Sequence, residues 1–158
     1  RALEASPGKA QAHHQLGLAL IGLGEWQGAL AEFQKVVAID PLYSAGDWFN
    51  IGSLLRRFKR PAEAIPHYRR ALEIARDDPA IMVDLAAAYA ESGEIETAIE
   101  TAERAVRLAP ESADARVTQG KILIIAGRSG PAADCFRRAL TIDPDHADAR
   151  QMLAALRK

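Results

Sequence analysis

The segment Arg70-Ala-Leu-Glu-Ile-Ala-Arg76 decides the fold, because related segments recur along the chain at a fixed spacing. The two that follow are Arg104-Ala-Val-Arg-Leu-Ala-Pro110 and Arg138-Ala-Leu-Thr-Ile-Asp-Pro144, each 34 residues after the one before it. At the start of the chain, Arg1-Ala-Leu-Glu-Ala-Ser-Pro7 precedes Lys35-Val-Val-Ala-Ile-Asp-Pro41 by the same 34 residues. Self-similarity at such a period indicates a stack of repeated structural units.

Each period contains two stretches with helical spacing of apolar residues. In the first period Leu16, Leu20 and Leu23 are spaced by four and three residues, which predicts one apolar helix face. Gly24 then ends this helix, because glycine readily adopts the left-handed backbone of a helix C-terminus. A second apolar stretch follows, so the unit is predicted to be a helix-turn-helix hairpin. The same turn position is occupied in the later periods by Lys59, Gly93 and Gly127.

Prolines mark where the second helices end. The residue before a proline is disfavoured in α-helical geometry. Second helices are therefore expected to end before Pro41, Pro110 and Pro144. Between the first and second periods the repeat step is 35 residues, which predicts one inserted residue in the connection 40–45. Pro66 falls inside a second helix and is expected to kink or delay it.

Composition excludes several classes of function. The chain has 158 residues, of which 49% are hydrophobic and 6% aromatic. The formal charge of −1 lacks the basic excess of a nucleic-acid-binding protein. No apolar run reaches the roughly 18 residues that span a bilayer. The single cysteine, Cys135, cannot form an internal disulfide, so a cytoplasmic location is favoured and a periplasmic one stays open.

The repeat resembles the tetratricopeptide repeat, whose unit runs Trp-x2-Leu-Gly-x2-Tyr, then Ala-x3-Phe, then Pro. The second unit matches this pattern at Trp48, Ile51, Gly52, Leu55, Ala64 and Tyr68. The fourth unit departs from it, because Arg116 and Gln119 occupy two normally apolar positions. The resemblance implies an all-α fold, a right-handed α-solenoid of stacked helix-turn-helix repeats.

Small residues at fixed positions explain how the helices approach one another. The first helices carry a small residue at one position, and the second helices carry an alanine at another. Large aromatic residues are then expected to fill the gaps between hairpins. The small residues are Gly17, Gly52, Ala86 and Gly120 in the first helices, and Ala29, Ala64, Ala98 and Ala132 in the second; the large ones are Phe33, Trp48, Tyr68 and Phe136.

The repeats divide the chain into consecutive segments. The predicted repeats are residues 10–44, 45–78, 79–112 and 113–146. Residues 1–9 are interpreted as the tail helix of a preceding repeat. Residues 147–158 are predicted to form a C-terminal capping helix, with Met152, Leu153 and Leu156 packing back on the stack and Arg157 and Lys158 near its end. Because the chain starts with Arg1 in mid-pattern, it reads as part of a longer polypeptide.

Family geometry places the first helices along a concave groove, which is expected to bind a peptide or protein segment. Asn50 is the leading candidate, because its amide can pair with a peptide backbone in both directions. An exposed polar residue without a binding role is the alternative for Asn50. The predicted groove residues are Gln15, Leu18, Phe49, Asn50, Ser53, Arg56, Arg57, Asp84, Ala87, Glu91, Thr118 and Lys121.

The basic cluster 56–60 has two interpretations. Cations at a helix C-terminus complement the helix dipole. The same cations are also suited to docking an acidic peptide, a phosphate or a carboxylate.

Motifs for catalysis, metals or cofactors are not found in the sequence. His13 and His14 are adjacent and point about 100° apart on a helix, so they do not chelate together. Residues 143–148 faintly resemble a calcium loop, but their aspartates are expected to cap the next helix. Cys135 is expected to be a small core residue. The chain is accordingly predicted to be neither an enzyme nor a cofactor-binding protein.

The leading hypothesis is therefore a scaffold for protein–protein interaction. One alternative is a substrate-positioning arm of a larger enzyme, for example a bacterial glycosyltransferase or sulfotransferase, whose catalytic domain lies outside this sequence. Self-association through exposed end surfaces is a further hypothesis.

Overall fold

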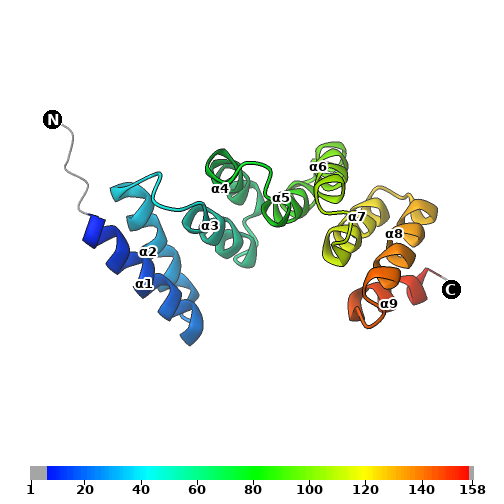
Figure 1. The fold of residues 1–158 in the computed structure, drawn as a ribbon, viewed down its shortest axis with the longest axis horizontal. Coiled ribbons are helices and arrows are strands. Elements are labelled where there is room, and N and C mark those ends of the chain that lie inside the picture. The colour runs from blue at the N-terminus through cyan, green and yellow to red at the C-terminus, as the bar shows by residue number, and fades with distance from the viewer. Residues whose placement is uncertain (1–6, 157–158) are drawn as a thin grey trace. The chain divides into compact units, whose positions relative to one another are not determined.

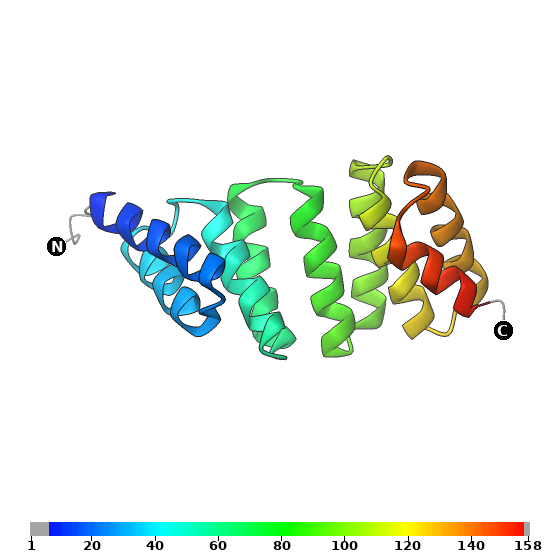
Figure 2. The same ribbon diagram turned by 90° about the horizontal axis from the view of Figure 1, so that it is seen from below.

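The structure is a computed structural model that describes residues 7–156, and over this range all regular structure is α-helical (Figures 1 and 2). The chain divides into two compact units, Arg1–Arg76 and Asp77–Lys158. The predicted all-α class of helix-turn-helix repeats is confirmed. Residues 1–6 of the expected preceding tail, and the expected Arg157 and Lys158 at the helix end, lie outside the described residues.

The first unit contains two antiparallel helical hairpins (Figure 1). Helix α1 (Pro7–Leu23) pairs with α2 (Trp26–Ile39), and α3 (Ala45–Arg57) pairs with α4 (Pro61–Ile74). The hairpins join because α2 packs against α3. Pro7–Lys9, assigned to the preceding tail on sequence grounds, form the start of α1. Helix α4 is assigned as one helix through Pro66.

The second unit repeats this arrangement and adds a final helix. Helix α5 (Pro79–Ser92) pairs with α6 (Ile95–Leu108), and α7 (Ala113–Ile125) pairs with α8 (Ser129–Ile142). Helix α7 contacts both α5 and α6, and α9 (Ala147–Ala155) packs against α8. Leu153 of α9 is buried in the core, and Met152 and Leu156 pack against this core, as the sequence predicts for these three residues.

The turns within the hairpins follow from residues that tolerate left-handed backbone. Gly24, Gly93 and Gly127 have φ values of 77°, 91° and 72°, and Lys59 has 60°. The residue after each turn position donates a backbone hydrogen bond into the preceding helix, for example from Arg128 to the carbonyl of Leu123 at 2.8 Å. The predicted insertion is confirmed, because residues 40–44 separate α2 from α3 whereas the other connections between hairpins are one residue shorter.

Ring-against-glycine contacts organise the core of three hairpins. Phe33, Tyr68 and Phe136 have no exposed surface, and each ring lies against the glycine 16 residues earlier: Gly17, Gly52 and Gly120 respectively. The hairpin of α5 and α6 instead has buried alanines at the two equivalent positions, 86 and 102. Small and large residues therefore alternate so that the space between paired helices is filled.

Some expected apolar residues are not buried. Leu16 is 47% exposed and Leu23 is 76% exposed, although Leu20 on the same face is half-buried. Within the first unit α1 packs mainly against α2, and this contact does not cover these two side chains. Trp48 is also only half-buried, and its indole N–H donates to the carbonyl of Pro41 at 2.8 Å.

Candidate functional site

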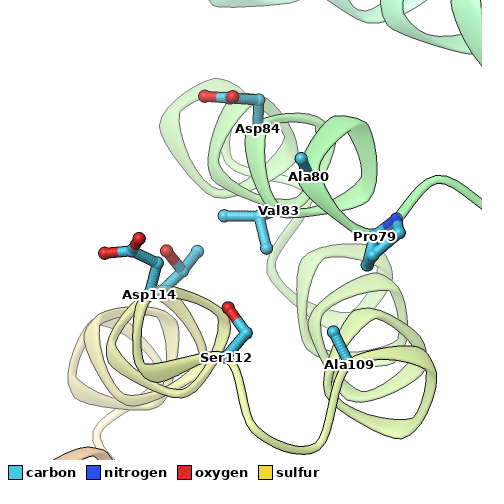
Figure 3. A pocket seen from close by; sticks show the side chains of 8 residues that line it. Pro79, Ala80, Val83, Asp84, Ala109, Ser112 and Asp114 are labelled. Atoms are coloured by element: carbon cyan, nitrogen blue, oxygen red, sulfur yellow. The ribbon is translucent and has the colours of Figure 1, made fainter. Parts of the chain in front are cut away.

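A hollow of about 400 Å³ lies between α5 and α7 in the second unit (Figure 3). The walls are partly apolar, and Val83 points into the interior. The hydroxyl of Ser112 also points inward, whereas the carboxylates of Asp84 and Asp114 both lie toward the same side of the opening. We call this site the acidic hollow; its lining residues are Pro79, Ala80, Val83, Asp84, Ala109, Ser112, Asp114 and Thr118.

The chain builds the acidic hollow from the starts of two helices. Asp78 caps α5 by accepting backbone N–H bonds from Ala80 and Ile81, and Pro79 occupies the first helical turn. Ser112 caps α7 through a hydrogen bond from the Ala115 N–H at 3.1 Å. These caps fix where each helix begins, and therefore where the carboxylates at its first turns are placed.

Both charged side chains that line the acidic hollow are acidic. Asp84 and Asp114 line it, and no lysine, arginine or histidine does. Asp114 accepts a hydrogen bond from Nε2 of His146 at 3.0 Å. His146 is also the N-cap of α9, where its Nδ1 accepts from the Ala149 N–H. The sequence expectation that the neighbouring aspartates cap this helix is wrong, because the imidazole of His146 takes the capping position.

The structure brings two of the predicted groove residues, Asp84 and Thr118, together at the acidic hollow. The other predicted residues of the second unit do not line it. Lys121 donates to Asp148 of α9 at 2.5 Å, and this bond holds the pKa of the Asp148 carboxyl below its usual value. Glu91 is exposed and Ala87 half-buried farther along α5.

Predicted groove residues of the first unit lie on α1 and α3. The Ser53 hydroxyl is 3.2 Å from the Tyr68 hydroxyl, and the Phe49 ring lies 5.7 Å from the Tyr68 ring. Leu18 is 42% exposed, so it offers an apolar contact surface. Gln15 is exposed and Asn50 is half-buried.

The basic cluster is partly used within the fold. The Arg57 guanidinium lies 3.9 Å from the centre of the Trp26 ring, a cation–π contact. Arg60 binds Glu63 through two hydrogen bonds of 2.6 and 2.7 Å. Arg56, also predicted to face the groove, is half-buried. Arg57 and Arg60 therefore both make local contacts within the first unit.

Sequence reasoning missed two histidine–carboxylate pairs. Nδ1 of His13 lies 2.6 Å from Glu32, and Nδ1 of His14 lies 2.7 Å from Asp47, which has no exposed surface. Hydrogen bonds from Lys35 and then His13 hold the pKa of Glu32 below its usual value. One signal for the pair of His13 and Glu32 was available in the sequence, because these residues occupy the same repeat positions as Trp48 and His67.

Trp48 and His67 form the equivalent pair in the next hairpin. Their rings stack, with 5.5 Å between the ring centres and an angle of 26° between the ring planes. In both hairpins the two residues are separated by 19 positions, one on each helix. Burial lowers the pKa of His67, although the charge of Glu63 acts in the opposite direction. The two positions thus connect the paired helices through different chemistry in these two hairpins.

Metal-binding clusters and membrane spans are both absent from the described part of the chain. Within residues 7–156, no group of three or more His, Cys, Asp or Glu side chains is arranged to hold a metal ion. None of the described helices is long and apolar enough to cross a membrane. Cys135 is 9% exposed, and burial raises the pKa of its thiol, although nearby arginines act in the opposite direction.

Comparison with family models identifies repeats along the chain. Models described as tetratricopeptide repeat match residues 10–43, 55–122 and 113–146. The similarity therefore covers both units.

Solved structures with the same fold cover nearly the whole chain. YrrB, described as a TPR protein with an unusual peptide-binding site, is 22% identical, with a TM-score of 0.81 over 95% of this chain and 77% of that one. MamA from Desulfovibrio magneticus RS-1 is 24% identical, with a TM-score of 0.80 over 91% and 79%. A thermophilic TPR protein of Thermus thermophilus is 20% identical, with a TM-score of 0.77 over 93% and 80%. At these identities the likeness shows the fold alone.

One curated relative is more similar in sequence over a shorter length. Small glutamine-rich tetratricopeptide repeat-containing protein 2 of Mycosarcoma maydis is 28% identical over 92 residues. This match covers 58% of the present chain and 26% of that protein. The chain thus spans about a quarter of the relative's length.

Proposed function

We propose that this chain, which belongs to the tetratricopeptide repeat family, is a protein-interaction module that takes an extended peptide segment into the acidic hollow. The observation that carries the proposal is a hollow with an apolar wall and two aspartates but no lining cation. Such a site favours a segment that presents a lysine or arginine beside an apolar residue. The cation is attracted to the carboxylates, and removing the apolar wall from water is favourable in free energy.

The shape and chemistry of the site support a peptide over a compact ligand. Hydroxyl groups of Ser112 and Thr118 lie beside the carboxylates, so backbone N–H groups of a bound segment would find acceptors next to the charged ones. The description of YrrB as having a peptide-binding site is consistent with this use of the fold. The remaining predicted groove residues, Asn50 among them, are proposed as additional contacts.

A matched pair of tryptophan substitutions tests the proposal. Ala80 and Ala62 are both exposed, and each follows the proline that begins its helix, but only Ala80 lines the acidic hollow. Ala80→Trp should fill the acidic hollow. Ala62→Trp makes the same substitution at the equivalent position of α4, which does not line the hollow. Thermal unfolding of both variants checks that each is folded.

Peptides that bind the unmodified protein are selected from a randomised display library. Their affinities for the unmodified protein, Ala80→Trp and Ala62→Trp are then measured by fluorescence polarisation. We expect selected peptides enriched in lysine or arginine, with affinity reduced at least about tenfold by Ala80→Trp, or about 1.4 kcal/mol. Affinity for Ala62→Trp should be unchanged. Selection of acidic peptides, or equal binding to Ala80→Trp, would contradict the proposal.

A further inference from the structure

A second hollow, of about 320 Å³, lies among α6, α7 and α8. Three arginines line it, so we call it the arginine hollow. Its residues on α7 are Arg116, Gln119 and Leu123, which are spaced by three and four positions and therefore share one helix face. Asp114 and Thr118 of the acidic hollow lie on the opposite face of α7, since each residue advances the helix by about 100°. The residues lining the arginine hollow are Glu103, Arg116, Gln119, Leu123, Arg128, Pro131, Asp134, Cys135 and Arg138.

The arginine hollow arises where the fourth repeat departs from the second. Arg116 and Gln119 occupy the positions that hold Trp48 and Ile51 in the second repeat. Ile51 is fully buried there, whereas Gln119 is half-buried and its side-chain oxygen lies 3.4 Å from Sγ of Cys135. Two polar side chains thus line the hollow at positions that are apolar in the second repeat.

The charges around the arginine hollow are not balanced within it. Its two carboxylates each have another arginine outside the lining: Asp134 pairs with Arg137 at 2.5 Å, and Glu103 lies 4.0 Å from Arg107. By contrast, no ion pair involves Arg128 or Arg138 among residues 7–156. The hollow therefore carries a positive charge that the fold itself does not neutralise.

Arg116 adds a donor that lacks a partner. Its Nη2 donates to the carbonyl of Pro110 at 3.1 Å, but its Nε is buried and has no hydrogen-bond partner in the described part of the chain. Buried donors are nearly always satisfied, because leaving one unpaired costs free energy. The N-terminus of α8, beside Arg128, also favours negative charge.

We propose that the arginine hollow binds a phosphate group carried by a ligand. Phosphate carries up to two negative charges and several acceptor oxygens, so it can accept from more than one guanidinium and from the Gln119 amide at once. A carboxylate has one charge and two oxygens and matches three arginines less well. The volume of the hollow leaves room for part of the molecule that bears the phosphate.

The test is a titration with inorganic phosphate at constant ionic strength, followed by NMR of the backbone and of the side-chain amide of Gln119. Arg128 and Arg138 are exposed, so Arg128→Gln and Arg138→Gln should not disturb folding. Arg150→Gln is the matched control, since Arg150 is exposed in the same unit and does not line the hollow. Acetate and chloride serve as competing anions, and a phosphate monoester replaces inorganic phosphate in a final arm.

We expect saturable chemical-shift changes confined to the backbone of α7 and α8 and to the side-chain amide of Gln119. The phosphate affinity should fall about tenfold in either lining variant and stay unchanged in Arg150→Gln. Ala80→Trp should leave phosphate binding intact, which separates this site from the acidic hollow. Shifts spread over all exposed lysines and arginines, or equal loss in Arg150→Gln, would overturn the proposal as non-specific anion binding. Acetate binding as tight as phosphate would overturn the assignment to phosphate.

Discussion

Gly52 of α3 faces the ring of Tyr68 of α4 so closely that a Cβ on Gly52 would lie 2.8 Å from Cε1 of the ring. The ring is fully buried, and its hydroxyl is held near Ser53. It therefore has little room to move away. Gly120 shows the same relationship with Phe136 at 2.6 Å.

Gly52→Ala should destabilise the protein by about 1–3 kcal/mol, because the added methyl group overpacks the hairpin. Gly22→Ala is the control, since Gly22 is helical and a Cβ there meets nothing within 4 Å. That variant should instead gain about 0.5–1 kcal/mol from reduced backbone entropy in the unfolded chain. Urea unfolding measures the free energy of unfolding of both variants. A Gly52→Ala protein as stable as the unmodified protein would contradict the role of this contact.

His14→Ala should cost about 3 kcal/mol at neutral pH, because it leaves the fully buried Asp47 without its hydrogen bond. His13→Ala should cost less than about 1 kcal/mol, since Glu32 keeps Lys35 as a partner at 2.6 Å. A double-mutant cycle with Asp47→Ala measures the coupling between His14 and Asp47. Strictly additive effects in this cycle would show that the pair does not stabilise the junction of α1 with α3.

His67 should make stability depend on pH in the mildly acidic range. Burial lowers its pKa from 6.5 in the folded protein, so the unfolded chain binds the proton more readily. The free energy of unfolding should therefore decrease as pH falls through about 6.5. His67→Phe keeps a ring beside Trp48 and should lose this part of the pH dependence. An NMR titration midpoint for His67 at or above the usual value would contradict the prediction.

Cys135 should react slowly with thiol reagents in the native state. Burial raises the pKa of its thiol and limits access, and the thiolate is the reactive form. The reaction rate at pH 8 should rise at least about tenfold when urea unfolds the chain. Equal rates in native and unfolded protein would show that Cys135 is accessible in the folded state.

Local signals in the sequence were sufficient for the helix ends. The sequence places Gly24, Gly93, Gly127 and Lys59 correctly at left-handed turns, because backbone preference at one residue decides such a position. The predicted cap of α9 is wrong, because α9 begins at Ala147 and His146 therefore occupies the capping position. The other ring nitrogen of His146 contacts Asp114, which lies 32 residues away in the sequence. Exposure of Leu16 and Leu23 likewise depends on which helices lie beside α1.

The candidate sites were only partly accessible from sequence. Family geometry assigns a face to each first helix, and on that basis the sequence singled out Asp84 and Thr118, which both line the acidic hollow. Arg116 and Gln119 were recognisable as polar residues at apolar positions, but nothing in the sequence joined them to Arg128 and Arg138.

The sequence by itself determined the repeating hairpins, because a 34-residue period, small residues opposite aromatic rings and turn-forming residues all act over short stretches of chain. Tertiary structure alone decided which polar side chains meet, as in the pairing of His14 with Asp47 or the gathering of three arginines at one hollow. The physical reason is that a period specifies where a residue lies on its helix, whereas its partners depend on how neighbouring helices pack.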